Sequence, residues 1–265
     1  MKVVRFELYR AFHSRTFYIS LVIGTVICAI DLITFSVMFL SSLKGKYLIQ
    51  AWIGTDYQFA YNQMFYILLP VFACLPHAGS LFTDIKTGYD KNICVKTSRI
   101  NYIAAKCISV FLSGFAAVTI PLFLNFYVSA GIFPDYHAER LTALSIGLPD
   151  TYMFVSIYNH DPALYCLLYM LIDGLFAGAI ALTSLSIARA VKSHFSAVVT
   201  PMVILIIYSI MSGAKDFGNW SVIAMLNPRQ YMHFYWYQML IVYLVILIVN
   251  AAVITITSKK RDIYE

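Results

Sequence analysis

Charge is scarce in this sequence. Asp, Glu, Lys and Arg together make up 12% of the 265 residues, whereas soluble domains carry about 25%. Hydrophobic residues reach 60%, and the mean hydropathy is +0.74. This composition excludes a soluble globular protein and predicts an all-α, polytopic membrane protein. Because nearly all of the chain is needed to span the bilayer, we expect a single membrane domain that covers 1–265.

The signatures of enzymes are missing as well. The pair Gly45-Lys46 lacks both the first glycine and the following hydroxyl of a phosphate-binding P-loop. Neither His-Glu-x-x-His nor Gly-x-Ser-x-Gly occurs. We therefore expect no enzyme activity, no catalytic residue and no cofactor in this chain.

Cysteine usage gives no sign of a disulfide framework or a metal site. The five cysteines form no Cys-x-x-Cys pair and are odd in number: Cys28, Cys74, Cys94, Cys107 and Cys166. We interpret them as small apolar packing residues.

The net charge of +6 comes from basic residues at the ends of apolar runs, so we expect contacts with lipid headgroups and not with nucleic acid.

Long apolar runs dominate the chain. We place six membrane spans at 17–40, 62–82, 103–130, 163–188, 195–211 and 234–257. Pro70 and Pro76 lie inside the second span, where we expect a kink. With both chain ends in the cytoplasm, 14 of the 19 Lys and Arg residues fall in cytoplasmic segments, as the positive-inside rule requires.

The first 14 residues precede the membrane. On a helical wheel Val4, Leu8 and Ala11 cluster on one side, whereas Glu7 and Arg10 fall mostly on the other. This pattern predicts an amphipathic helix over 1–14 that lies in the cytoplasmic interface. A basic flank that only sets orientation is the alternative.

Two longer segments, 131–161 and 212–231, are expected on the external side. The first contains a fairly apolar stretch at 141–158 that is broken by Gly147, Pro149 and Asp150. We interpret this stretch as an interfacial or re-entrant piece. A seventh span is less favoured, because it would invert the sidedness of everything downstream.

Two carboxylates lie inside apolar runs. Asp31 and Asp173 both fall about 14–15 Å from the outer ends of their spans, at 1.5 Å per residue. An aspartate at a helix centre costs about 2.5–3.5 kcal/mol on insertion, so it usually faces protein or water. Either the two line one aqueous vestibule and meet a cationic or amphipathic substrate, or each hydrogen-bonds a Ser, Thr or Tyr on a neighbouring helix or stays protonated. Gly174 and Gly178 have the Gly-x-x-x-Gly spacing that lets helices approach closely.

A charged island separates the second and third spans. Five basic residues lie in it, namely Lys86, Lys91, Lys96, Arg99 and Lys106, and this excess assigns the loop to the cytoplasm. Thr87-Gly88 predicts a turn, Tyr89–Val95 a short helix, and Ser98 an N-cap for the third span. Since the chain has no nucleotide motif, we hypothesise that the loop at 83–102 takes mechanical input from a soluble partner. A solvated orientation signal is the alternative.

The N-terminal KVVRFELYRAFHSRTF and the loop residues Phe82-Thr83-Asp84, Thr87-Gly88-Tyr89, Ser98-Arg99, Tyr102 and Lys106 resemble the permease subunits of type-2 ATP-binding-cassette exporters. The resemblance implies that two permease chains, identical or related, form a twelve-helix unit above two separate ATPase subunits. ATP and Mg²⁺ would bind to those partners. It also implies a coupling helix with these contact residues: Thr87, Gly88, Tyr89, Asp90, Lys91, Asn92, Ser98 and Arg99.

The same resemblance implies a multi-pass protein of the bacterial plasma membrane that moves an antimicrobial or other amphipathic peptide, or another hydrophobic substrate. It further implies re-entrant helices at 214–231. Two other functions stay open. One is an ion-coupled secondary transporter that uses Asp31 and Asp173 as proton sites, which an inverted repeat would favour. The other is an intramembrane enzyme without a known motif.

Overall fold

The computed structural model describes residues 2–38, 48–55, 60–95, 97–133, 153–188, 190–191, 193–213, 220–230 and 233–259. Of these residues 85% are helical, and none of them forms a strand. The predicted all-α class is confirmed.

Five long apolar helices form the frame of the described structure. They are α2 (Arg15–Met38), α7 (Arg99–Ile132), α10 (Pro162–Ile187), α11 (His194–Gly213) and α13 (Trp236–Lys259). Each is long and apolar enough to cross a membrane. Even the shortest, α11, extends about 30 Å at 1.5 Å per residue, which matches the hydrocarbon core of a bilayer. Such helices are typical of a multi-pass membrane protein.

The second predicted span is not one continuous helix. The apolar helix α4 (Ala60–Cys74) has 15 residues and ends well before the predicted boundary at 82. Turns follow it, and a separate short helix, α5 (Ser80–Lys86), then begins. The expectation of a merely kinked span over 62–82 is therefore wrong.

Proline chemistry explains this break. Pro76 has no N–H, and its ring clashes with the carbonyl four residues earlier, which belongs to Phe72. The hydroxyl of Ser20 donates to that carbonyl over 2.9 Å. The carbonyl of Pro76 itself accepts from the hydroxyls of Ser14 and Thr16, at 3.0 and 2.8 Å. The start of α2 thus satisfies the carbonyls that the break in α4 leaves free, whereas Pro70 stays inside α4.

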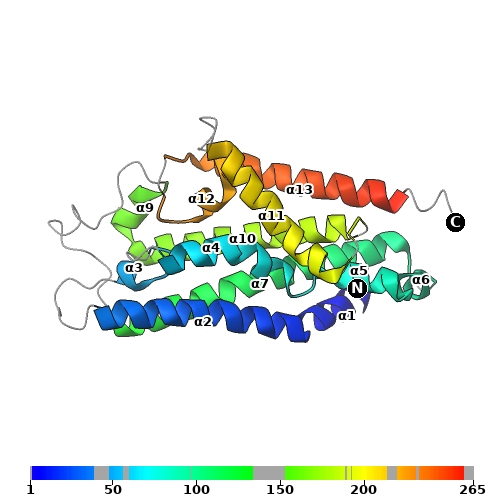
Figure 1. Cartoon of the computed structure of the whole chain (residues 1–265), viewed down its shortest axis with the longest axis horizontal. Coiled ribbons are helices and arrows are strands. Elements are labelled where there is room, and N and C mark those ends of the chain that lie inside the picture. The colour runs from blue at the N-terminus through cyan, green and yellow to red at the C-terminus, as the bar shows by residue number, and fades with distance from the viewer. Residues whose placement is uncertain are drawn as a thin grey trace.

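The short elements gather at the two ends of the molecule. Figure 1 shows α1 (Lys2–Phe12), α6 (Tyr89–Cys94) and the last turn of α13 at one end. At the opposite end lie α3 (Leu48–Ala51), α9 (Val155–His160) and α12 (Val222–Leu226). The N-terminal helix, the charged loop and the end of α13 therefore share one end, as expected. Which side of a membrane that end faces stays a prediction.

Helices α7 and α10 pack closely at the centre. A Cβ added at Gly174 would lie 2.3 Å from the hydroxyl of Thr119, and one at Gly178 would lie 2.7 Å from the ring of Phe111. Both glycines of the Gly-x-x-x-Gly pair thus face α7. Gly114 of α7 likewise faces α10, since a Cβ added to it would lie 2.8 Å from the Cβ of Ala181. Small residues on both helices allow this close approach.

The N-terminal helix differs from its predicted polarity. Glu7, which we expected mostly on an outward polar side, is completely buried, as is Ala11. Tyr9 is 61% exposed on the other side. Glu7 faces α7, where its carboxylate lies 2.8 Å from the buried ammonium of Lys106, a contact that the wheel pattern does not reveal. The interfacial position of the helix stays a prediction.

The two segments expected on the external side are described in part. The stretch at 141–158 lies mostly outside the described residues. Its last residues belong to α9, which is followed by Asp161. Asp161 caps α10 by accepting from the N–H of Ala163 over 3.0 Å. In the second segment α12 is buried, with Met225 and Leu226 at 0% and 2% exposure. The seventh-span alternative stays undecided, since residues 134–152 are not described.

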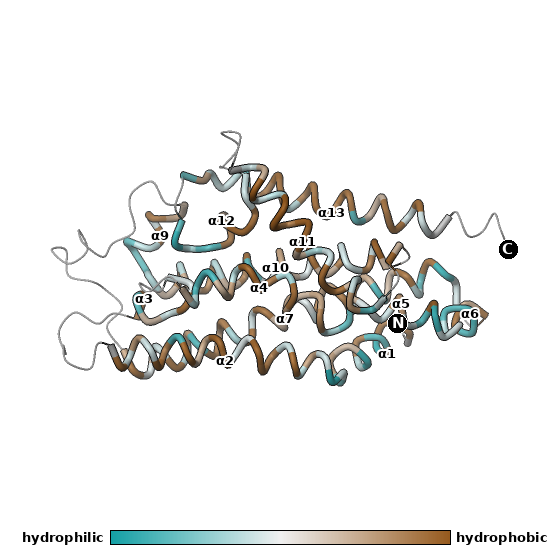
Figure 2. The backbone as a smooth tube through the Cα atoms, viewed as in Figure 1, coloured by the Kyte–Doolittle hydropathy of each residue, from teal (hydrophilic) through white to brown (hydrophobic). Residues whose placement is uncertain are grey.

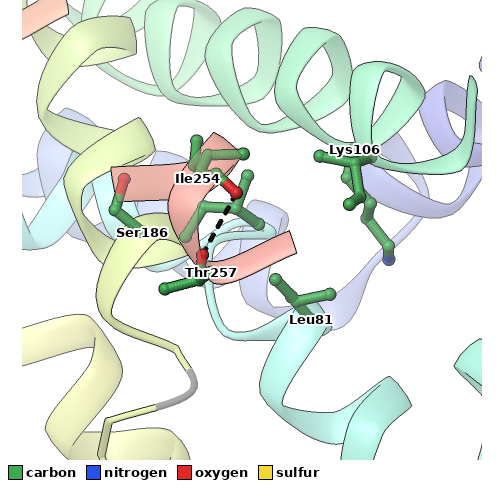
Figure 3. Close-up of a pocket in the computed structure, with 7 residues that line it drawn as sticks. Leu81, Lys106, Ser186, Ile254 and Thr257 are labelled. Atoms are coloured by element: carbon green, nitrogen blue, oxygen red, sulfur yellow. Dashed lines mark hydrogen bonds between the residues drawn. The ribbon is translucent and has the colours of Figure 1, made fainter. Parts of the chain in front are cut away.

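Two cavities lie between the helices, and the smaller is at the end that carries α1 and α6. A small one of about 10 Å³ is lined by seven residues from α5, α7, α10 and α13: Leu81, Ile103, Lys106, Leu185, Ser186, Ile254 and Thr257 (Figure 3). A larger, open groove of about 190 Å³ lies between α10, α11 and α13. Hydrophobic residues run along α2, α11 and α13 (Figure 2).

Candidate functional site

The charged loop folds as two turns around a short helix. Gly88 adopts φ 71°, a left-handed conformation that costs glycine little, and this residue separates α5 from α6. The hydroxyl of Thr87 donates to the carbonyl of Thr83 over 2.9 Å. Ser98 caps α7, because its side chain accepts from the N–H of Asn101 at 3.4 Å. The turn, the short helix and the cap all lie where the sequence indicates.

The tip of this loop is apolar as well as charged. Val95 is 86% exposed and Ile100 is 80% exposed, at the end of the molecule where α6 lies. Lys91 and Asn92 are close to them in the chain, and Asp90 is buried. Exposed apolar patches mark contacts with a protein or a membrane, and these two side chains are the most exposed large hydrophobic residues that the structure describes.

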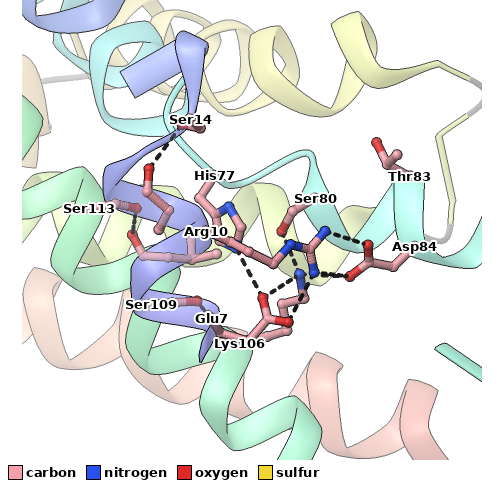
Figure 4. A network of polar contacts seen from close by, with 12 residues as sticks. Glu7, Arg10, Ser14, His77, Ser80, Thr83, Asp84, Lys106, Ser109 and Ser113 are labelled. Carbon is pink, nitrogen blue, oxygen red and sulfur yellow. Dashed lines mark hydrogen bonds and ion pairs between the residues drawn. The ribbon is translucent and has the colours of Figure 1, made fainter. Parts of the chain in front are cut away.

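A buried ion network lies directly behind the loop. Its centre is Lys106 of α7, whose side chain is 0% exposed. Its ammonium lies 2.8 Å from the Glu7 carboxylate and 2.7 Å from the Asp84 carboxylate, and it donates to the Ser80 hydroxyl over 3.1 Å. Figure 4 shows these groups converging from α1, α5 and α7. In Figure 3 the same ammonium points away from the small cavity.

The second cation of the network is Arg10. Its guanidinium lies 2.9 Å from Oδ1 of Asp84 and 3.0 Å from Oε1 of Glu7. Asp84 also accepts from the hydroxyl of Tyr102 over 2.6 Å. His77 lies 3.2 Å from Oε2 of Glu7 through Nε2, and because an ionised carboxylate only accepts, this nitrogen is the donor.

Two carboxylates and two cations balance within this network. Burial by itself raises the pKa of Glu7, but the hydrogen bond from His77 and the charge of Lys106 outweigh it and lower the pKa to about 2. Burial also opposes ionisation of Asp84, whose pKa is nevertheless lowered by the hydrogen bond from Arg10 and the charge of Lys106. Both carboxylates are therefore ionised near neutral pH.

The network reaches α6 through an aromatic ring. The guanidinium carbon of Arg10 lies 5.0 Å from the centroid of the Tyr89 ring. A cation over a ring face at this distance is attracted by about 0.5–2 kcal/mol. Tyr89 is the first residue of α6. One set of contacts therefore joins the loop helix to α1, α5 and α7.

A second polar group lies deep between α4 and α10. The hydroxyl of Tyr66 donates to Oδ2 of Asp173 over 3.0 Å, and both residues are almost completely buried. Oδ1 of Asp173 has no hydrogen-bond partner in the described part of the chain. Tyr165 and Tyr169 precede Asp173 at intervals of four residues, so they share its helix face. The amide of Gln230 donates to the hydroxyl of Tyr169 over 3.1 Å.

Asn62 joins the elements at the end opposite the loop. Its amide donates to the carbonyls of Ile53 and Gly54, at 2.7 and 2.9 Å. Its oxygen accepts from the amide of Asn227, which comes directly after α12. Asn62 and Tyr66 lie one turn apart on α4, so a polar seam runs from the segment after α12 to Asp173.

The predicted site residues thus fall into separate groups. The loop residues and the ion network form one group, and Asp173 belongs to the other, where it has the tyrosine partner that one of our alternatives foresaw. Asp31 lies on α2 and is 1% exposed. A vestibule that Asp31 shares with Asp173 stays a prediction. Among the described residues, no cluster of three or more His, Cys, Asp or Glu could hold a metal ion.

Sequence reasoning missed most of the ion network. Asp84 and Lys106 bound the charged island, and Glu7 and Arg10 were assigned to an outward face. The signal that could have joined them is a balance of charge, since two acids and two bases flank the same end of the predicted spans. His77 carried no signal of its own, and Tyr102 was named only among the loop residues that carry the resemblance.

Comparison of the chain with models of protein families, with curated proteins and with solved structures finds no match. The function must therefore be argued from the two polar groups and the loop.

Proposed function

We propose that this chain is the membrane permease subunit of a type-2 ATP-binding-cassette exporter in a bacterial plasma membrane. With a second permease chain it would form a twelve-helix pathway, and separate ATPase subunits would bind ATP and Mg²⁺. The proposed cargo is an amphipathic or antimicrobial peptide, or another hydrophobic molecule. This chain performs no hydrolysis in the proposal; it converts a push from the partner into helix movement.

One observation carries the proposal: α6 lies at an exposed tip, and its first residue, Tyr89, contacts Arg10 of the ion network that joins α1, α5 and α7. Val95 and Ile100, at 86% and 80% exposure, offer apolar contacts to a partner. Behind them, Arg10 contacts both the ring of Tyr89 and the carboxylate of Asp84. A loop needed only to set orientation has no use for such an anchor.

The anchor suits the transmission of force. Buried ion pairs have a few discrete arrangements, because an unpaired buried charge costs several kcal/mol. A displacement of α6 would therefore move α1 and α7 with it or exchange one set of pairs for another. Lys106 lies on α7, a helix of 34 residues that runs the length of the molecule. Input at α6 would reach the opposite end through α7.

Co-purification tests the proposal. The tagged chain, extracted in mild detergent from its own host, should carry an ATPase subunit with a P-loop. Val95→Asp and Ile100→Asp should lower the recovered ATPase about tenfold, since each removes an apolar contact of about 1.4 kcal/mol or more. Arg5→Asp, on the exposed side of α1, is the matched surface change and should leave recovery unaltered. If every variant recovers the same amount of ATPase, the tip beside α6 does not contribute to ATPase binding and no longer supports the proposal.

The second candidate is an ion-coupled secondary transporter that uses Asp31 and Asp173. The observation that favours it is the buried Asp173 carboxylate with one oxygen lacking a partner among the described residues. Intramembrane carboxylates of this kind often relay protons. Transport that stops with an uncoupler and continues without ATP would support the carrier. Transport that depends on ATP and ignores the proton gradient would support the exporter.

A further inference from the structure

The open groove between α10, α11 and α13 has an almost entirely aliphatic lining. Nine residues form it: Ile180, Thr183, Pro201, Ile204, Leu205, Val245, Ile246, Val249 and Asn250. Its volume of about 190 Å³ is space for about six water-sized groups. The groove lies about two turns after Asp173 along α10 and shares no residue with the ion network.

The shape of the groove results from the paths of the helices. Both α11 and α13 pack on α10, and Figure 1 shows α11 crossing obliquely in front of α13 and separating from it toward the end that carries α6. Pro201 frees the carbonyl of Ala197, which accepts from the hydroxyl of Ser184 on α10. That contact holds α11 to α10 beside the groove and leaves the space toward α13 open.

The two polar residues in the lining are already bonded to the protein. The amide nitrogen of Asn250 donates to the carbonyl of Ala179 and to the hydroxyl of Thr183, at 3.2 and 3.1 Å. Its oxygen accepts from the hydroxyl of Ser186 at 2.9 Å. The remaining lining offers no hydrogen bond, so water in the groove would lack the two to four polar partners that it needs. The chemistry favours an alkyl chain.

The position of the groove indicates that this alkyl chain comes from the lipid bilayer. The two helices that border it, α11 and α13, are the least buried of the five candidate spans, at 22% and 17%. The groove residues of α13, from Val245 to Asn250, lie near the middle of its 24 residues. Those of α11, from Pro201 to Leu205, likewise lie near the middle of its 20 residues. Because both helices are about as long as a bilayer core is thick, the groove lies at the depth of the lipid acyl chains.

We propose that this groove binds one acyl chain of a membrane phospholipid. The acyl chain fills a space between α11 and α13, and without it the side chains that line this space would lose packing contacts. The bound lipid is thus a structural ligand that sets the separation of α11 from α13. The inference is independent of the ATPase partner and of the cargo.

Photo-crosslinking tests it. The full chain is reconstituted in vesicles of phosphatidylglycerol and phosphatidylcholine that contain a phospholipid with a diazirine in the middle of one acyl chain. After illumination, mass spectrometry maps the labelled residues. We expect label concentrated on Ile180, Ile204 and Val249. Val249→Trp should lower that label about fivefold or more, because the indole fills the groove and interiors tolerate little extra volume.

Ile248→Trp is the matched control, since Ile248 is 65% exposed on the same helix and lies outside the groove lining. It should leave the label unchanged, and Ile204→Trp should repeat the loss from the opposite wall. Label spread evenly over α11 and α13, and equal in all variants, would overturn the inference. A disulfide between two copies of Val249→Cys would overturn it in favour of a second chain in the groove.

Discussion

The ammonium of Lys106 lies 2.8 Å from the carboxylate of Glu7, and neither side chain is exposed. These residues are far apart in the sequence, and their contact fixes the N-terminal helix against α7. Arg10 and Asp84 complete the balance of charge around them. The loop helix α6 joins this network through Tyr89, so the network is one physical link between the loop and the long helices.

Removal of one charge from the network should lower the free energy of unfolding more than removal of two opposite charges together. Lys106→Met leaves two carboxylates facing one cation and should destabilise the protein by about 3–5 kcal/mol, as for other broken buried pairs. Glu7→Gln should also destabilise it. The double change restores balance between Arg10 and Asp84, so its cost should fall below the sum of the two single costs by about 2 kcal/mol. Unfolding in detergent measures this cycle.

Arg5→Gln supplies the control for that cycle, since Arg5 is exposed on α1. Its change should leave the unfolding free energy within about 0.5 kcal/mol of the parent. Additive costs for Glu7→Gln and Lys106→Met would show that the two side chains do not act as a pair.

Acid should weaken the protein over a defined range. The pKa of Glu7 is lowered from its usual value near 4.5 to about 2, so ionised Glu7 stabilises the folded state fully above about pH 4.5. As the pH falls from there toward 2, the unfolded chain takes up the proton first, and stability declines by about 1.4 kcal/mol per pH unit. Asp84, whose pKa is also lowered, adds to the slope in the same direction.

Unfolding midpoints between pH 5 and pH 2 measure this effect. In Glu7→Gln the slope should be shallower, because only Asp84 of the pair then titrates. A slope identical in the parent and in Glu7→Gln would mean that Glu7 is not ionised in the folded state.

The glycines between α7 and α10 should differ from a glycine in open space. A Cβ at Gly178 would lie 2.7 Å from the ring of Phe111, whereas one at Gly131 would meet no atom within 4 Å. Gly178→Ala should therefore cost about 1–3 kcal/mol through overpacking. Gly131→Ala should be neutral or stabilise the helix by about 0.5–1 kcal/mol. Equal effects in a thermal unfolding assay would contradict close packing of these helices.

Changes at Asp173 test the role of the deep polar group. If its carboxylate meets a cationic substrate, Asp173→Asn should lower transport by about tenfold, the loss that corresponds to 1.4 kcal/mol. Tyr66→Phe, which removes only the hydroxyl bonded to Asp173, should lower it less. Asp31→Asn tests the second carboxylate in the same assay. Unchanged transport in Asp173→Asn and Asp31→Asn at normal expression would end the substrate-contact interpretation.

The helices were largely predictable, and their junctions were not. The apolar runs around Asp31 and Asp173 predicted α2 and α10 within two residues at each end, because an uninterrupted hydrophobic stretch bounded by charge leaves the chain few alternatives. Ser98 also indicated where α7 begins. The break at Pro76 was predicted only as a kink, since a proline does not reveal whether neighbouring hydroxyls will satisfy the carbonyls that it frees.

The ion network depends on that break and was therefore missed. When α4 ends and α5 turns away, Asp84 comes to lie beside Lys106 and Arg10. A continuous span would have kept Asp84 on a separate turn of the loop. The tyrosine partner of Asp173 was foreseen as a residue type, but Tyr66 could not be chosen among 20 tyrosines without the helix packing.

A photo-crosslinker placed at Val95 shows whether α6 docks on an ATPase. Val95 is 86% exposed at the tip beside α6, and in living cells the crosslinker captures whatever docks there. We predict a product with an ATPase subunit that contains a P-loop, identified by mass spectrometry, and no such product when the crosslinker replaces Tyr127, which is 70% exposed near the opposite end of α7. Crosslinks from Val95 to lipid alone, or to proteins without a nucleotide-binding motif, would contradict the proposal that α6 receives force from an ATPase.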